Sequence, residues 1–218
     1  MDKLKLFILS ESRRKILSSF VSWKNDFYLA GGTGLALQIG HRDSSDFDFF
    51  SNHPFDSNKM IGQLSKLFGG KSFTVTQVEK NTLSILLDSE IKLSFITYDY
   101  LLLEPLILTE YINIASIPDI ACMKLSAIMQ RCALKDYVDL YEIMKKYSLE
   151  QLLSYAKKKY PMIDSTVILK SLSYLEDIID EPLIYKDEKL KPTLITLKQF
   201  FKDEVRKHIN KIIRAQGL

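Results

Sequence analysis

Two aspartates separated by one residue, Asp46 and Asp48, are the side chains in this sequence best suited to chemistry. They open the run Asp46–Phe50, in which acidic and aromatic residues alternate as in a β-strand. Because strand side chains alternate between two faces, both carboxylates are expected on one face and Phe47 and Phe49 on the other. Two carboxylates this close repel each other, and both stay ionised at neutral pH only beside a positive charge. A hard divalent cation, Mg²⁺ or Mn²⁺, meets that need, so both are predicted metal ligands. The plainer alternative is a pair of solvated acids on an edge strand.

Nearby segments add features that bind anions. A double glycine and a threonine stand between a predicted strand and a predicted short helix, whose N-terminal N–H groups attract an anion: Gly31, Gly32 and Thr33. The polar loop before the aspartates adds Arg42, whose planar guanidinium can hold a phosphate, and Ser45. Alone, a double glycine is more often a tight turn and an arginine an ordinary surface residue. Together with the acid pair they predict a site for a metal-bound triphosphate.

The elements that must position these residues divide the chain into two parts. The first part predicts strands and helices, with helices over 10–23, 33–39 and 56–68 and strands over 27–30, 46–50, 73–76, 83–87 and 91–96. After Pro118 the pattern is helical, with helices over 118–130, 135–147, 149–159, 165–179 and 193–215. The predicted class is therefore α+β, with a mixed β-sheet head flanked by helices over 1–117 and a helical part over 118–218.

Composition excludes several classes of protein. The 218 residues are 46% hydrophobic and 26% charged, as in ordinary globular proteins, so wholesale disorder is excluded. Cys122 and Cys132 form neither a metal-ligand spacing nor a disulfide framework, which favours a reducing compartment. The N-terminal apolar run is too short for a signal peptide. The apolar stretch near Leu101 is broken by Glu104 and Pro105, well short of the ~20 residues of a membrane span. A cytoplasmic protein without a membrane segment is expected.

Positive charge is spread unevenly, although the net charge of +3 is too small to indicate nucleic-acid binding. One basic run is Lys157–Lys159, and another lies in the last predicted helix. There the spacing i, i+4, i+7 puts three cations on one face: Lys207, Lys211 and Arg214. Both runs fit solvated helix faces, and the second also fits a row of cations along an RNA backbone.

The segments Gly31–Leu37 and His41–Phe50 resemble the nucleotidyltransferase toxins of the AbiEii/AbiGii type. These belong to the wider DNA polymerase β-like superfamily, whose motif is Gly-Gly or Gly-Ser, a spacer, and Asp-x-Asp. Two later segments, Lys124–Arg131 and Lys135–Tyr141, resemble the same toxins. The resemblance spans roughly Tyr28–Tyr147, and the remaining C-terminal residues match only as generic helices.

This resemblance implies an activity and its components. A nucleoside monophosphate would pass from an NTP to an acceptor hydroxyl with Mg²⁺ (or Mn²⁺), releasing pyrophosphate. The chain would be the toxin of a toxin–antitoxin or abortive-infection system, with RNA or a tRNA end as acceptor and a cognate antitoxin as partner. Asp46 and Asp48 would bind the metal and act in catalysis, and Gly31, Gly32 and Thr33 would hold the phosphates.

The resemblance also gives roles to two residues of the helical part. It places Lys124 against a nucleotide phosphate, whereas the apolar helix around it would equally fit a lysine that extends to solvent. It makes Asp139 a catalytic acid that orients the acceptor or holds Lys124, whereas its position opposite the apolar stripe of its helix would equally fit solvent exposure. Lys135 and Asp136 are weaker candidates for support contacts.

One departure from the superfamily leaves two alternatives open. A third metal-binding acid often lies on a neighbouring strand, and Ser94 stands where that acid is expected. Ser94 puts a full two-metal site in doubt and favours a degenerate module that binds a nucleotide or partner without turnover. The intact Asp46, Asp48, Lys124 and Asp139 oppose that alternative. The other alternative is a small-molecule nucleotidyltransferase of the antibiotic-modifying type.

Overall fold

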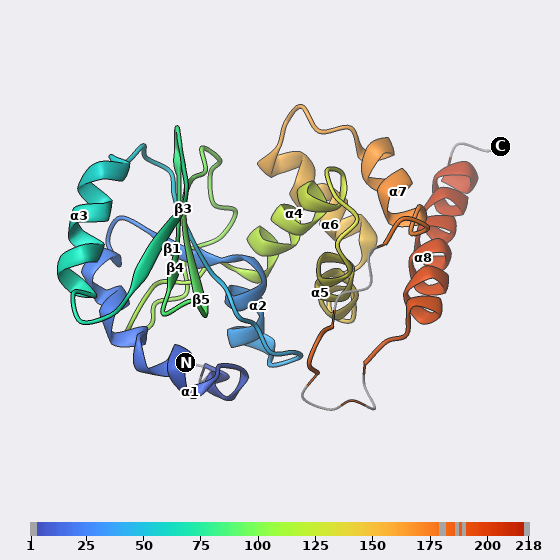
Figure 1. Ribbon diagram of the computed structural model, residues 1–218. Coiled ribbons are helices and arrows are strands. Elements are labelled where there is room, and N and C mark those ends of the chain that lie inside the picture. The colour runs from blue at the N-terminus through green and yellow to red at the C-terminus, as the bar shows by residue number, and fades with distance from the viewer. Residues whose placement is uncertain (1–3, 179–181, 186–187, 189–190, 216–218) are drawn as a thin grey trace. The chain divides into compact units, whose positions relative to one another are not determined.

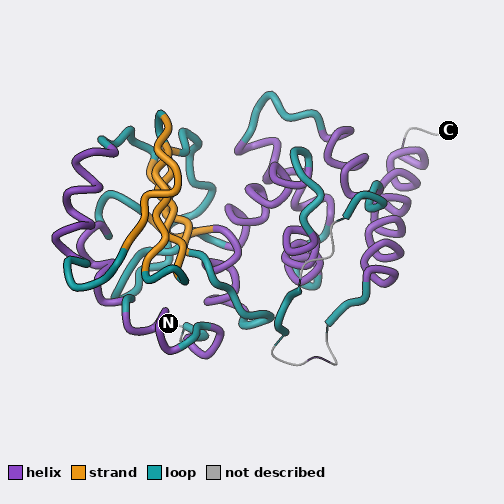
Figure 2. The backbone as a smooth tube through the Cα atoms, viewed as in Figure 1, coloured by secondary structure: helices purple, strands orange, loops and turns teal. Residues whose placement is uncertain are grey.

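The computed structural model describes residues 4–178, 182–185, 188 and 191–215, which form two compact units (Figure 1). The first unit is Met1–Ser116 and the second is Ile117–Leu218. Strands occur only in the first unit among the described residues, and the second is built from helices and loops (Figure 2). The predicted α+β class with a mixed sheet is confirmed. No helix in the described part of the chain is long and apolar enough to cross a bilayer.

The first unit is built on a five-stranded sheet with the order β1-β2-β5-β4-β3. β2 and β5 are parallel, and the other neighbouring pairs are antiparallel. The strands are β1 (Tyr28–Ala30), β2 (Phe47–Ser51), β3 (Phe73–Glu79), β4 (Thr82–Leu87) and β5 (Ile91–Thr97). The helices are η1 (Leu6–Ile8), α1 (Glu11–Lys15), η2 (Leu17–Trp23), α2 (Gly31–Ile39) and α3 (Ser57–Leu67).

An aromatic cluster forms the core on one face of this sheet. Phe49 of β2 stacks on Phe95 of β5 with ring centroids 5.0 Å apart. Phe20 and Trp23 of η2 meet the Phe49 ring edge-on at 4.9 and 5.4 Å. Helix α3 lies on the same side of the sheet and adds Met60 and Leu64 to this core (Figure 1). Since Phe47 and Phe49 point into this core, the intervening Asp48 points to the opposite face.

The single helix predicted over 10–23 is wrong, because the segment forms α1 and then the 3₁₀ helix η2. A 3₁₀ helix has three residues per turn, so side chains spaced by three lie above one another. Leu17, Phe20 and Trp23 follow that spacing, and all three are buried. The tighter helix therefore directs all three apolar side chains to the core.

The second unit contains five helices in its described residues. They are α4 (Ile117–Ile128), α5 (Leu134–Met144), α6 (Leu149–Lys159), α7 (Ser165–Ser173) and α8 (Leu194–Ala215). All five were predicted, and α6 has its predicted bounds because Ser148 and Gln151 form a capping box at its start. The helix predicted to end at residue 179 already ends at Ser173, and residue 179 itself lies outside the described residues.

Replacement of Phe49 by Ala should destabilise the first unit strongly. Its ring is fully buried and contacts the rings of Phe20, Trp23, Phe47 and Phe95. We expect the free energy of unfolding to fall by about 3–5 kcal/mol, as for other large-to-small core substitutions. Urea unfolding followed by tryptophan fluorescence measures the change, with Phe7→Ala as control because the Phe7 side chain is half exposed. Equal effects of the two substitutions would contradict the assignment of the core.

Candidate active site

A close approach between α2 and β2 fixes the position of the Asp48 carboxylate. Gly31, the first residue of α2, has a φ of +63°. A Cβ atom at this position would lie only 2.8 Å from Oδ2 of Asp48. Two independent reasons therefore favour glycine at this position: the left-handed backbone conformation and the lack of space for a Cβ atom. The predicted helix start at residue 33 is wrong by one half-turn, since Gly31 and Gly32 belong to α2.

The N-terminus of α2 is open to an anion. The residue before it, Ala30, has no side-chain oxygen to cap the helix, and the first turn contains no acidic residue. Free N–H groups and the helix dipole make such an end favourable for phosphate. Gly31 follows the residue that pairs with Asp48 across β1 and β2, so this open end begins beside that aspartate.

Thr33 positions the loop that leads into β2. Its side chain is buried, and Oγ1 lies 2.7 Å from Oγ of Ser44. The same hydroxyl contacts the backbone carbonyl oxygen of Asp46, to which it donates. Thr33 thus holds the backbone that presents Asp46, while Ser45 Oγ donates to the Asp46 carboxylate at 3.2 Å. Because the Thr33 hydroxyl is engaged in these contacts, only its backbone N–H could donate to a phosphate.

Two arginines also support this loop. Nε of Arg13 donates to the carbonyl oxygen of Ser45 at 2.9 Å, and its guanidinium forms an ion pair with Glu90 at 3.0 Å. Arg13 was not predicted as a site residue, because it lies 32 residues before Ser45 and no motif surrounds it. Arg42 was predicted to hold a phosphate, but its side chain is buried and donates to the carbonyl oxygen of Asp43 at 3.0 Å. This geometry gives Arg42 a role in shaping the loop.

A polar row crosses the sheet on the face of Asp48. Asp48 pairs with Ser94 on β5, and Ser94 pairs with Ser84 on β4. The two serine hydroxyls lie 3.4 Å apart and both are buried. Ser94 therefore occupies the position directly beside Asp48 where a third acid would stand. Consistently, no group of three or more metal-ligating side chains is found among the described residues.

The second unit contains a network of two cations and two acids, of which Lys124 and both acids are buried and Arg131 is exposed. Nζ of Lys124 on α4 lies 2.7 Å from a carboxylate oxygen of Asp136 and 2.7 Å from one of Asp139, both on α5. Nε of Arg131 lies 2.8 Å from the other Asp136 oxygen. Lys124 is 6% exposed and both aspartates are fully buried. The solvent-exposed alternatives for Lys124 and Asp139 are therefore wrong, and Asp136 is an equal member of the network.

Neighbouring cations control the ionisation of Asp136. Burial alone would raise the pKa of this carboxyl, but the attraction of Lys124 and Arg131 outweighs burial and holds the pKa below its ordinary value. A lowered pKa in the folded state adds stability that is present above the ordinary pKa and is lost as the pH falls through the folded value. Asp136 is therefore ionised at neutral pH.

A second buried ion pair joins α4 to α6. Nζ of Lys159 lies 2.7 Å from Oδ1 of Asp119, and both side chains are fully buried. Lys159 belongs to the basic run predicted as a solvated helix face, so that prediction is wrong for this residue. Burial also raises the pKa of the nearby Cys122 thiol to about 12, which keeps it protonated and unsuited to nucleophilic or metal chemistry.

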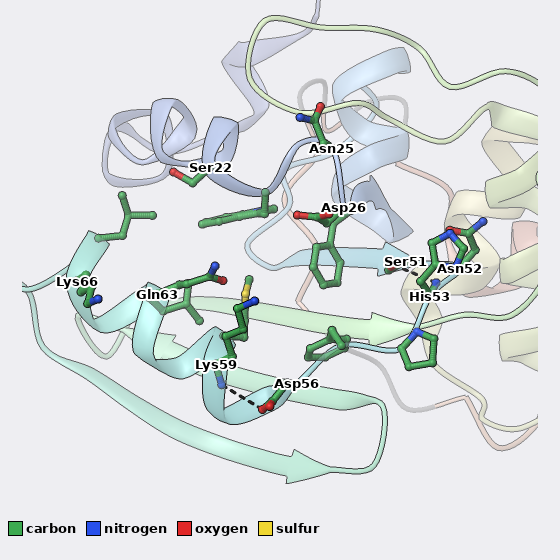
Figure 3. A pocket seen from close by; sticks show the side chains of 17 residues that line it. Ser22, Asn25, Asp26, Ser51, Asn52, His53, Asp56, Lys59, Gln63 and Lys66 are labelled. Atoms are coloured by element: carbon green, nitrogen blue, oxygen red, sulfur yellow. Dashed lines mark hydrogen bonds between the residues drawn. The ribbon is translucent and has the colours of Figure 1, made fainter.

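The first unit also has a pocket of about 810 Å³ on the sheet face opposite Asp48. It lies between the segment Ser22–Phe27, the residues after β2 and helix α3 (Figure 3). Trp23, Phe27 and Met60 form part of its apolar wall, while Asp26 and Lys59 are among its polar lining residues. This pocket contains none of the predicted site residues.

Comparison with protein families decides the identity of this arrangement. The family described as "Nucleotidyl transferase AbiEii toxin, Type IV TA system" matches residues 15–215. The chain belongs to the AbiEii nucleotidyltransferase toxin family. An uncharacterized protein of Aquifex aeolicus is 42% identical over 209 residues, which cover 92% of this chain and 98% of that protein.

Solved structures share the fold of this AbiEii family member. A putative nucleotidyltransferase from Helicobacter pylori has a TM-score of 0.54 at 18% identity and covers 91% of this chain and 97% of its own. The nucleotidyltransferase toxin MenT4 of Mycobacterium tuberculosis has a TM-score of 0.54 at 16% identity, with 90% and 80% covered. Since AbiEii proteins are nucleotidyltransferases, the activity of this chain is nucleotidyl transfer.

Replacement of Gly31 by Ala should impair this AbiEii protein more in activity than in stability. Alanine in this left-handed backbone conformation should lower the free energy of unfolding by about 1–2 kcal/mol. The new Cβ must also displace the Asp48 carboxylate, because it would lie 2.8 Å from Oδ2. We expect nucleotidyl transfer to fall about 100-fold, as for a displacement of a reacting group by ~1 Å. Turnover assays beside thermal melting measure the two effects.

Gly62→Ala is the matched control for this substitution. Gly62 lies within α3, and a Cβ there would meet no atom within 4 Å. Alanine should leave transfer unchanged and raise stability by about 0.5–1 kcal/mol through its helix propensity. Full activity of Gly31→Ala would show that Asp48 need not keep its position.

Proposed function

We propose that this chain transfers a nucleoside monophosphate from an NTP to a hydroxyl group of RNA with the help of Mg²⁺ or Mn²⁺, and acts in this way as a toxin. The observation that supports this best is the placement of Asp48 against the uncapped N-terminus of α2. A metal-ligating carboxylate and a phosphate-binding helix end lie side by side there. The first unit would then be the nucleotidyltransferase head, working in the cytoplasm with NTPs and RNA.

The residues present suit a divalent cation. Asp46 and Asp48 alternate with core residues and so share one face, and they are hard oxygen donors. Mg²⁺ usually binds proteins through one or two carboxylates and keeps its other coordination positions for substrate phosphates. Two aspartates without a third acid meet this requirement. A bound cation there would neutralise charge on the reacting phosphate.

The transfer itself breaks one phosphoanhydride bond. The acceptor oxygen forms a bond to the α-phosphorus as its proton passes to solvent, and pyrophosphate leaves with the electrons of the broken bond. The N–H groups of Gly31, Gly32 and Thr33 would hold the phosphates at the helix end. Thr33 and Ser45 would hold Asp46 in place through its backbone and side chain.

Lys124 and Asp139 are proposed to take part in transfer as a unit. The ammonium of Lys124 would offset negative charge that develops on the phosphate. Two carboxylates fix that ammonium, since Asp136 and Asp139 each lie 2.7 Å from it. Asp139 is therefore proposed as the residue that orients Lys124, one of the two roles that the sequence suggested for it.

The proposed RNA acceptor does not depend on the C-terminal helix. Two of the three cations in its predicted stripe form ion pairs, Lys207 with Glu204 and Lys211 with Glu150, each at 2.7 Å. These pairs are exposed and weak, but they place an acid beside each cation and reduce the attraction for phosphate.

The family's toxin–antitoxin classification supports a cognate antitoxin as the further proposed partner.

Incubation of the pure protein with each labelled NTP, Mg²⁺ and total RNA tests this proposal. We expect label from at least one NTP to enter RNA and to disappear in the double variant Asp46→Asn, Asp48→Asn. The variant should keep the fold of the wild type, because asparagine preserves side-chain volume and introduces no new charge, and circular dichroism checks this. Full activity of the double variant would place the metal site elsewhere. Labelling of an aminoglycoside instead of RNA would support the antibiotic-type alternative, and no labelling at all would support the module without turnover.

Two buried lysines allow a matched test of Lys124. Lys124→Met and Lys159→Met each remove the cation of a buried ion pair and should each cost about 3–5 kcal/mol of stability. Only Lys124→Met should also lower turnover per folded molecule, by about 100-fold or more. Denaturant titration gives the folded fraction, and initial rates below the melting temperature give the turnover. Equal turnover per folded molecule in the two variants would leave Lys124 with a purely structural role.

A further inference from the structure

Lys92 lies on the sheet face that presents Asp48. On β5, Ile91 and Leu93 are buried in the core, so the intervening Lys92 points to the opposite face together with Ser94. Ser94 pairs with Asp48 in the parallel register of β2 and β5. Lys92 is therefore one step along the same face from the position where the third acid is missing.

The register also brings Lys92 beside Asp46. Phe47 pairs with Leu93, and Asp46 and Lys92 are the residues that directly precede this pair on the two parallel segments. Neighbouring strands are about 4.8 Å apart, which is within reach of a lysine side chain. The Lys92 side chain is nevertheless exposed and has no hydrogen bond or ion pair with any residue that the structure describes. Its ammonium thus remains available to a substrate next to the acid pair.

The two sides of the acid pair differ in what they can bind. The open N-terminus of α2 follows β1, and β1 and β5 flank β2 on opposite sides. In phosphoryl transfer the attacking and leaving oxygens lie roughly in line on opposite sides of phosphorus. If the NTP phosphates occupy the helix end, the acceptor must approach from the β5 side, where Lys92 stands.

The net charge of the site also supports a role for Lys92 on the β5 side of the acid pair. In a two-metal site the second cation stabilises one of the two in-line oxygens, and a third acid helps to hold it. Here serine replaces that acid, and a lysine two residues earlier offers a positive charge on the same strand face. One metal with two acids and Lys92 has the same net charge as two metals with three acids.

We propose that Lys92 binds an anionic group of the acceptor, a phosphate next to the accepting hydroxyl, and so selects a polyanionic acceptor over a cationic small molecule. This inference rests on the proposed function and adds the residue that recognises the acceptor. Lys92 takes no part in holding the NTP, whose phosphates lie at the α2 end.

Binding and turnover with pooled tRNA test Lys92. We expect Lys92→Gln to lower kcat/KM for tRNA by about tenfold, as for loss of one charge-assisted hydrogen bond, and Lys92→Arg to restore most of it. Because one phosphate contact is lost, the log–log salt slope of tRNA binding should become shallower by about 0.7. Affinity for a non-hydrolysable NTP, measured by calorimetry, should stay unchanged.

Lys66→Gln is the matched control, since Lys66 is an exposed lysine on α3, on the other face of the sheet. It loses the same charge and should match the wild type in every measurement. Equal tRNA binding and kcat/KM in the Lys92 and Lys66 variants would overturn the role of Lys92. A loss of NTP affinity in Lys92→Gln would also overturn it and assign Lys92 to the nucleotide. Failure of the proposed function is distinguished by the wild type, which would then label no RNA with any NTP.

Discussion

The negative charge of two closely spaced carboxylates, Asp46 and Asp48, is the constraint around which this part of the first unit is arranged. Asp48 points away from the aromatic core because Phe47 and Phe49 on either side of it are buried there, and Asp46 directly precedes this strand. The core therefore fixes the direction of Asp48, and neighbouring groups must stabilise the negative charge. The positive end of the α2 helix dipole stabilises the Asp48 carboxylate, and only glycine at position 31 allows the helix to begin so close to that carboxylate. Thr33 ties the loop before β2 to the same helix, so one short element holds both acids.

Much of this arrangement could be predicted from the sequence, because it depends on local patterns. Alternation of polar and apolar residues predicted the strands of the sheet, and the helix predicted over 56–68 is present as α3, with Asp56 as its N-cap. The pairing of the site residues depends on contacts that no local pattern encodes. Arg13 reaches Ser45 across 32 residues, and the position of Lys92 beside the acids follows only from the register of β2 and β5. Helix η2 was not predicted, because apolar residues at a spacing of three also fit one face of an α-helix.

The burial of charged side chains in the helical part was the feature least well predicted from the sequence. A lysine in a basic run is usually solvated, yet Lys159 is fully buried because Asp119, forty residues earlier, neutralises it. Pairing with another helix also buries Asp139, for which solvent exposure was the alternative to a catalytic role. Periodicity identifies the apolar face of a helix, but it does not show which charged residues on the other face are covered and paired by a second helix, as Lys159 and Asp139 are. Such pairing between distant helices is a property of the tertiary structure.

The two buried lysine sites differ in a way that bears on their roles. Replacement of a buried ion pair by apolar residues is often neutral or stabilising, so such pairs are poorly explained by stability alone. The Lys159–Asp119 pair is sealed on both sides, with both side chains fully buried. The Lys124 network instead reaches the surface, since the Arg131 side chain that holds Asp136 is 59% exposed. Lys124 also has two carboxylates where one would neutralise it, and each additional contact narrows the positions open to its ammonium. A network that fixes a cation more tightly than neutralisation requires, and that extends to solvent, suits a group whose position matters to a reaction.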